Sequence, residues 1–220
     1  MEETNFILLW EEQNKKIDKA IALNRRLLLD NIQQKTRNTL QSLIRSKAVG
    51  IGIAVLYLLL LGVPLFYAIV YYKPAANYFI ISIGAIFLIN LKALFDYIKH
   101  IVLASGIDYN GSVMEIQQKL SRIHLAIMQH GRTMFLQLPF WTTFFLSSSW
   151  FPSKTSAGLV IMQVSITLAF TLLAIFLYRS LTIKNMDKKW VRAILSGAGG
   201  KKVISALSFY KEMENFRDDN

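Results

Sequence analysis

The chain has 220 residues, of which 53% are hydrophobic, and carries 25 Lys and Arg residues against 14 Asp and Glu residues. A mean hydropathy of +0.35, with the apolar residues gathered into long blocks, excludes an ordinary soluble globule and favours one membrane domain with polar extensions. The absence of cysteine excludes disulfides, thiolate metal ligands and thiol nucleophiles.

The basic residues are concentrated in three segments. Residues 1–47 hold nine Lys and Arg, residues 92–133 hold five and residues 179–220 hold nine, and the same segments hold all 14 acidic residues. Membrane proteins enrich their cytoplasmic segments in Lys and Arg for reasons of topology alone. The pattern therefore predicts a multi-pass protein of the inner membrane with both termini in the cytoplasm, and it argues against direct nucleic-acid binding.

Residues 4–34 have the pattern of an amphipathic helix. Its apolar face carries Phe6, Trp10, Gln13, Ile17, Ile21, Asn24 and Leu28. Two interpretations remain open: the face packs on other cytoplasmic helices of the same chain, or it docks on another protein. The hypothesis of a protein partner takes the contact residues to be Phe6, Trp10, Ile17, Ile21, Asn24 and Leu28.

The first expected membrane span follows a basic approach. Lys35, Arg37, Arg45 and Lys47 occur with no acidic residue among them, which predicts contact with anionic lipid headgroups. Residues 48–72 then contain no charged side chain. A helix of this length would reach about 37 Å, enough to cross a bilayer.

The second span is expected at residues 78–95, and its helical pattern continues beyond the membrane. The turn-forming residues 105–112 interrupt it, and Ser112 and Glu115 match a capping box that starts a new helix. The new helix has heptad-like apolar positions at Val113, Ile116, Leu120, Ile123, Ile127, His130 and Met134. Residues 92–133 are therefore predicted to form an antiparallel cytoplasmic hairpin.

The third and fourth spans are expected near residues 133–151 and 157–178, and residues 179–220 form a helical cytoplasmic tail. The predicted fold is thus all-α: a four-helix transmembrane bundle, residues 48–178, that includes the hairpin. The cytoplasmic helical extensions are the N-terminal amphipathic segment 1–47, the hairpin and the C-terminal helices.

No motif for catalysis or for a cofactor is found. GAGGKK at residues 197–202 lacks the spacing, the Ser or Thr and the preceding strand of a phosphate-binding loop. His124 and His130 are six residues apart, unlike the i, i+4 pair of a helical zinc site, whereas Asp96 and His100 could share a hydrogen bond. The sequence predicts a protein that is not an enzyme, with no cofactor and no metal.

Three polar residues lie within the expected spans. Asn90, Gln137 and Gln163 are explained by hydrogen bonds between helices, or by the lining of a polar interior. The second explanation corresponds to a small transport or channel component, in which several copies could form an oligomer. The spans carry no ionisable residue at mid-depth, whereas transport proteins usually place such residues there.

The N-terminal segment resembles a group of four-span bacterial membrane proteins whose genes often neighbour those of extracytoplasmic-function sigma factors. The resemblance is carried by Trp10 with Gln13-Asn14, by Leu23-Asn24 with Arg26-Leu27-Leu28, and by the basic approach to the first span. It implies an anti-sigma-like regulator that holds a sigma factor at the membrane. Anti-sigma factors with one span carry a sizeable outer sensor domain, whereas the outer loops here are only a few residues long.

Overall fold

The computed structural model describes residues 2–109, 111–182, 185, 188–197, 200–206 and 208. Every regular element within these residues is helical, as the sequence predicts. The elements are α1 (Glu2–Val70), η1 (Pro74–Ala76), α2 (Asn77–Ser105), α3 (Val113–Met134), η2 (Phe135–Thr142), α4 (Ala157–Ser180) and α5 (Lys189–Gly197).

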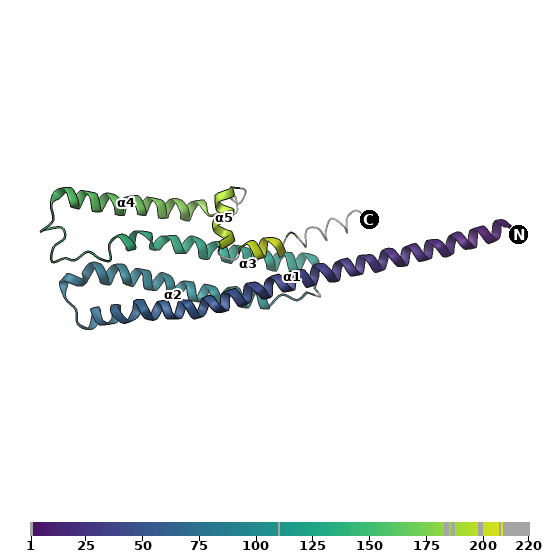
Figure 1. The fold of residues 1–220 in the computed structure, drawn as a ribbon, viewed down its shortest axis with the longest axis horizontal. Helices are drawn as coiled ribbons and strands as arrows, with labels where there is room; N and C mark the ends of the chain where they lie inside the picture. Colours follow the sequence, from purple (N-terminus) through teal and green to yellow (C-terminus); the bar gives the residue numbers. More distant parts are fainter. Residues whose placement is uncertain are drawn as a thin grey trace.

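The helix α1 is one uninterrupted element of 69 residues. At 1.5 Å per residue it is about 100 Å long. It joins the expected amphipathic segment, the basic approach and the first span without a break, and it continues through Pro64. Its N-terminal part projects beyond every other element (Figure 1).

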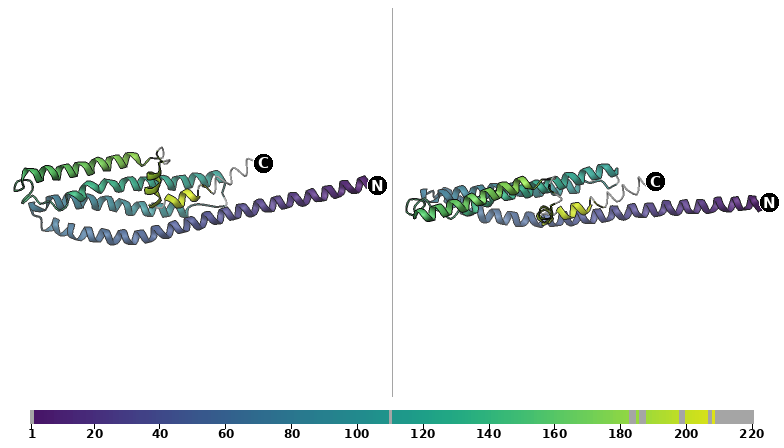
Figure 2. Two further views of the ribbon diagram at one scale, coloured as in Figure 1. Left: turned by 45° about the horizontal axis from the view of Figure 1, so that its top comes forward. Right: turned by 90° about the horizontal axis from the view of Figure 1, so that it is seen from above.

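The chain passes four times along the same bundle, and the helices lie side by side (Figures 1 and 2). The third pass is formed by α3, the 3₁₀ helix η2 and the turns at residues 143–154. It returns to the end of the bundle where α1 meets α2, because the Ser147 hydroxyl donates to the Ala75 carbonyl at 2.9 Å. The Tyr78 and Phe151 rings also meet there, at 5.9 Å.

The third pass differs from the regular transmembrane helix expected at residues 133–151. The α-helix ends at Met134 because Pro139 has no N–H and leaves the Phe135 carbonyl without its α-helical donor. Nearby hydroxyls then take over backbone acceptors, as the Thr142 hydroxyl donates to the Pro139 carbonyl at 2.7 Å. Three helices of the described chain are long and apolar enough to cross a membrane, in α1, in α2 with η1, and in α4.

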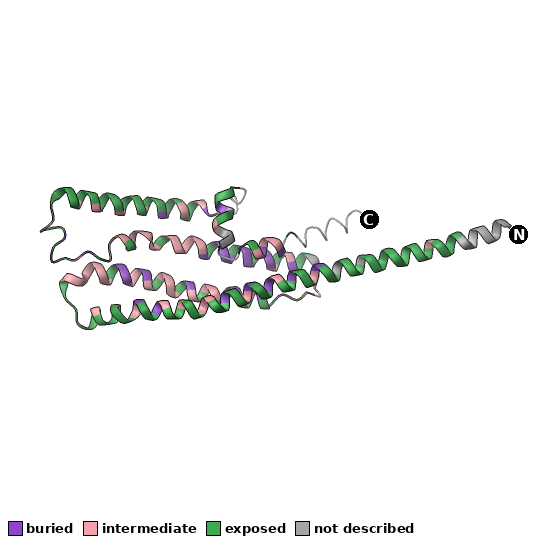
Figure 3. Ribbon diagram, in the orientation of Figure 1, coloured by how far each residue is buried: buried purple, intermediate pink, exposed green. Residues whose placement is uncertain are grey.

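The main buried core lies at the opposite end of the bundle, where α1, α2 and α3 run side by side (Figure 3). Ser112 caps α3 as predicted, since its hydroxyl accepts from the Glu115 N–H at 3.3 Å. The residues of this three-helix core are Ile32, Leu40 and Leu43 of α1, Ala104 and Ile107 of the α2 end, Ile116, Leu120, Ile123 and Ile127 of α3, and Val203 and Ala206.

The C-terminal part packs back on the same end of the molecule. The helix α5 buries Val191 against Met128 and Leu181. Residues 200–206 are helical, and the Lys202 ammonium donates to the Ser42 carbonyl at 2.9 Å. The end of the helical tail predicted for residues 179–220, from residue 209 onward, lies outside the described residues.

Candidate functional site

Residues 2–31 of α1 form an arm, and the residues proposed for partner binding lie on it. The side chain of Phe6 lies outside the described part of the chain. The other apolar members are exposed to 62% at Trp10, 52% at Ile17, 59% at Ile21 and 37% at Leu28, and Asn24 is exposed as well. The described arm is exposed over nearly its whole length (Figure 3).

Packing on the chain's own helices begins only beyond this stripe. It involves Ile32, near the end of the predicted amphipathic helix, and Leu40 and Leu43, which lie in the basic approach to the first span. Of the two interpretations of the apolar face, internal packing therefore applies to residues 32–47 and not to residues 10–28.

Lys47 corrects the prediction that all four basic residues before the first span face lipid headgroups. Lys35, Arg37 and Arg45 are exposed, but Lys47 is only 6% exposed. Its ammonium lies over the Tyr97 ring, 4.3 Å from the centroid. A buried ammonium is tolerated there because the electron-rich ring face stabilises its charge.

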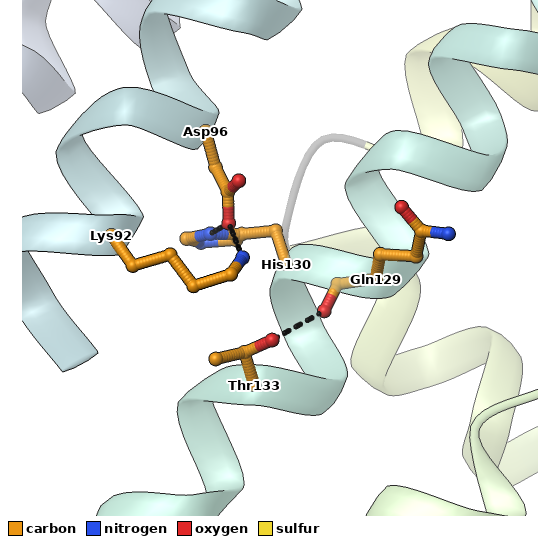
Figure 4. A network of polar contacts seen from close by, with 5 residues as sticks. All are labelled: Lys92, Asp96, Gln129, His130 and Thr133. Atoms are coloured by element: carbon orange, nitrogen blue, oxygen red, sulfur yellow. Dashed lines mark hydrogen bonds and ion pairs between the residues drawn. The ribbon is translucent and has the colours of Figure 1, made fainter.

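A second candidate site is a polar junction where α1, α2 and α3 meet beside the apolar half of the bundle. Asp96 is its centre: its Oδ2 lies 2.8 Å from the Lys92 Nζ and 3.3 Å from the His130 Nδ1 (Figure 4). The Tyr97 ring contacts the His130 ring at a tilt of 48°, with 5.0 Å between the ring centroids. Lys47 of α1 lies over the same Tyr97 ring. The junction therefore joins the Lys47 ammonium of α1, the Asp96 carboxylate of α2 and the His130 imidazole of α3.

His100 is the most deeply buried member of the junction, with 1% exposure. Its ring meets that of His130 edge-on at 5.8 Å. Neither of its nitrogens has a hydrogen bond of good geometry in the described structure, and the backbone of Ala126 in α3 is only a weak partner, which raises the pKa slightly. The charge-free part of α2 ends at Leu91, and His100 lies after Lys92, Asp96 and Lys99, beyond the span expected at residues 78–95. Burial lowers the pKa of His100 to about 4, with a smaller contribution from the Lys47 charge, so the ring is neutral at pH 7.

The predicted hydrogen bond between Asp96 and His100 is wrong. The two residues share a helix face, but the carboxylate is taken by Lys92 and His130 instead. Spacing within one helix finds i, i+4 neighbours and cannot reveal a contact with another helix. The signal that could have found His130 is its heptad position in α3, which places it toward α2.

The three polar residues of the apolar half serve as hydrogen-bonding groups between elements. The Asn90 amide donates to the Gln137 side-chain oxygen at 3.0 Å and to the Ile86 carbonyl at 2.8 Å. The Gln163 amide donates to the Thr142 carbonyl at 2.6 Å. Gln163 is thus separate from the other pair, and it borders a cavity of 320 Å³ with a mainly apolar lining.

Replacing Gln137 with leucine tests the two explanations of these residues. We expect a loss of about 1 kcal/mol in the free energy of unfolding, because the Asn90 amide loses its partner on η2. The measurement is reversible unfolding in mixed detergent micelles, with Leu136→Ala as the exposed neighbouring control. A solute flux that Gln137→Leu abolishes without changing stability would instead favour a transport pathway.

No three His, Asp or Glu side chains of the described chain converge on a site that could hold a metal ion. Comparison of the sequence with protein-family models and with curated proteins gives no match, and no solved structure matches the fold. The exposed arm and the buried polar junction therefore have to be interpreted from their own chemistry.

Proposed function

We propose that this chain is a non-enzymatic, multi-pass protein of the bacterial inner membrane whose arm binds a protein partner. The observation that carries this proposal is the exposed stripe of Trp10, Ile17, Ile21 and Leu28 on a helix that projects beyond its own bundle. An apolar stripe of this kind is typical of helices that bind in a groove or beside another helix.

The proposed topology has four crossings, with both termini in the cytoplasm. It is supported by the placement of charge: residues 48–70, 78–91 and 157–178 contain no Asp, Glu, Lys, Arg or His. Apart from Lys73 and Lys154, the basic residues that the structure describes lie at the end of the bundle that also holds the hairpin and the arm. Under the positive-inside rule this end is cytoplasmic, and the arm then faces soluble proteins.

A transport function is supported less well. The Asn90 amide donates a hydrogen bond to the Gln137 side chain, and the Gln163 amide donates one to the Thr142 backbone carbonyl. Polar groups that are used in this way hold the irregular third pass against α2 and α4, since Thr142 also shares a hydrogen bond of 2.9 Å with Thr167 of α4.

The experiment is affinity purification from native membranes followed by mass spectrometry. The resemblance of the arm makes a sigma factor the first partner to test. We expect the wild-type chain to recover a sigma factor, and a triple Trp10→Ala, Ile17→Ala and Ile21→Ala variant to recover at least about tenfold less, because three apolar contacts are lost.

The matched control replaces Lys15, Lys19 and Arg26 with alanine, which preserves helix propensity and alters only the opposite, charged face of the arm. It should recover the partner as the wild type does. Recovery of no soluble protein, or of the same proteins by the stripe variant, would contradict the proposal.

A further inference from the structure

We propose that the arms of two copies of this chain pair side by side, in register, as a parallel two-stranded coiled coil. The inference rests on the proposed function, in that it treats the stripe as a protein-binding surface. It adds that a second copy covers the stripe whenever no other partner is bound.

The spacing of residues along one face of the arm fits a coiled-coil seam. Trp10, Ile17 and Asn24 recur every seven residues. Asn14, Ile21 and Leu28 form a second series with the same period, and the two series alternate at steps of four and three. Steps of this kind define the a and d positions, through which two helices interlock.

Anchoring in a membrane determines how two arms would meet. Each α1 is continuous from its apolar stretch, residues 48–70, to the arm. Arms of neighbouring copies in one membrane therefore point the same way and begin at the same height, so each residue faces its own counterpart. Confinement to the membrane also raises the effective concentration of arms, which helps a seam of only three heptads.

The polar members of the seam favour a second copy over an unrelated helix. In an in-register pair Asn14 faces Asn14 and Asn24 faces Asn24, and an amide can both donate to and accept from an identical amide. An apolar partner surface would leave these amides without hydrogen bonds. The residues directly before Asn14, Ile21 and Leu28 border one edge of the seam. They are Gln13, Ala20 and Leu27, which carry no charge, so no like charges meet across this edge of the pair.

The hairpin does not stand in the way of this pairing. At 100° per residue the seam lies about a quarter of a turn around α1 from the face of Leu40 and Leu43, which packs in the three-helix core. Beyond Leu28 the seam positions become polar and exposed at Asn31, Lys35 and Asn38. The seam thus ends where the three-helix core begins, and each α1 then contacts its own hairpin.

The test uses single cysteines, because the chain has none of its own. Ile17→Cys places the thiol in the seam, and Lys19→Cys places it on the outer face of the same helix. A disulfide requires Cα atoms within about 7 Å, a separation that only the seam position reaches in a parallel pair. In native membranes under mild oxidation, we expect at least about tenfold more covalent dimer from Ile17→Cys.

Equal cross-linking of the two variants, or cross-linking of neither, would overturn the inference. The wild-type chain, without any introduced cysteine, gives an independent measurement. In mild detergent its mass by sedimentation should be that of two copies. An Ile17→Asp, Ile21→Asp double variant should have the mass of one copy. A monomeric wild type that still recovers a sigma factor refutes self-pairing and leaves the proposed function standing. A cross-linked dimer that recovers no soluble protein supports self-pairing and refutes the proposed function.

Discussion

Replacing Leu120 with alanine should open the three-helix core and release residues 32–47 of α1 from the hairpin. Leu120 is fully buried among α1, α2 and α3. Truncation of a buried leucine typically costs 2 to 5 kcal/mol, because the apolar contacts are lost and a cavity remains. We expect a loss of about 3 kcal/mol in the free energy of opening.

Hydrogen–deuterium exchange of the detergent-solubilised chain measures this effect. Since about 1.4 kcal/mol is a factor of ten, the amides of α3 and of residues 32–47 should exchange more than about a hundredfold faster. Met114→Ala, on the same helix but 71% exposed, is the control and should leave exchange unchanged. Faster exchange confined to α3 would show that α1 does not depend on the hairpin.

This prediction concerns function because the core is what positions the arm. The apolar end of α1 faces the bundle through Leu61, which packs near Ile83 and Ile86 of α2. The three-helix core fixes the next stretch of α1 through Ile32, Leu40 and Leu43, and the arm before Ile32 projects beyond it. If the core opens, the arm loses its fixed direction, and pairing in register becomes less favourable because ordering the arm then costs entropy.

Local patterns in the sequence predicted much of this architecture. The capping residue Ser112 and the buried residues Ile116, Leu120, Ile123 and Ile127 follow from spacing alone, because one helix face decides burial. The long apolar helices follow equally well from hydropathy.

Contacts between distant segments could not be predicted in this way. Nothing local marks Lys47 as buried, since its environment is made by Tyr97 of another helix. Pro139 was visible in the sequence, but whether it kinks a helix or ends one depends on acceptors supplied by neighbours such as Thr142. The length of α1 was also missed, because the shift of its apolar face at Ile32 looks in sequence like the end of a helix.

Acidification should weaken the polar junction, and His100→Leu should remove much of that sensitivity. The unfolded imidazole titrates near 6.5, whereas the pKa of His100 in the folded chain is about 4. Between these values the unfolded state binds more protons, so the free energy of unfolding falls as the pH falls. From pH 7.5 to pH 5 the loss from His100 is about 2 kcal/mol.

Burial is the main cause of this response, a weak hydrogen bond with the Ala126 backbone opposes it, and the charged groups near His100 modify it. The positive charge of Lys47 lowers the pKa of His100, and Asp96 opposes that effect only weakly because its carboxylate already pairs with Lys92 and His130. Burial lowers the pKa of His124 and of His130 as well, so both leave a residual acid sensitivity in the variant.

Unfolding of the wild type and of His100→Leu in mixed micelles, measured from pH 7.5 to pH 5, separates these contributions. Leucine leaves no buried nitrogen without a partner, so we expect the stability at pH 7.5 to change little. The two stability curves should then diverge by about 2 kcal/mol toward pH 5. Parallel curves would mean that His100 becomes protonated without separating the helices, and the junction would then be a passive packing site.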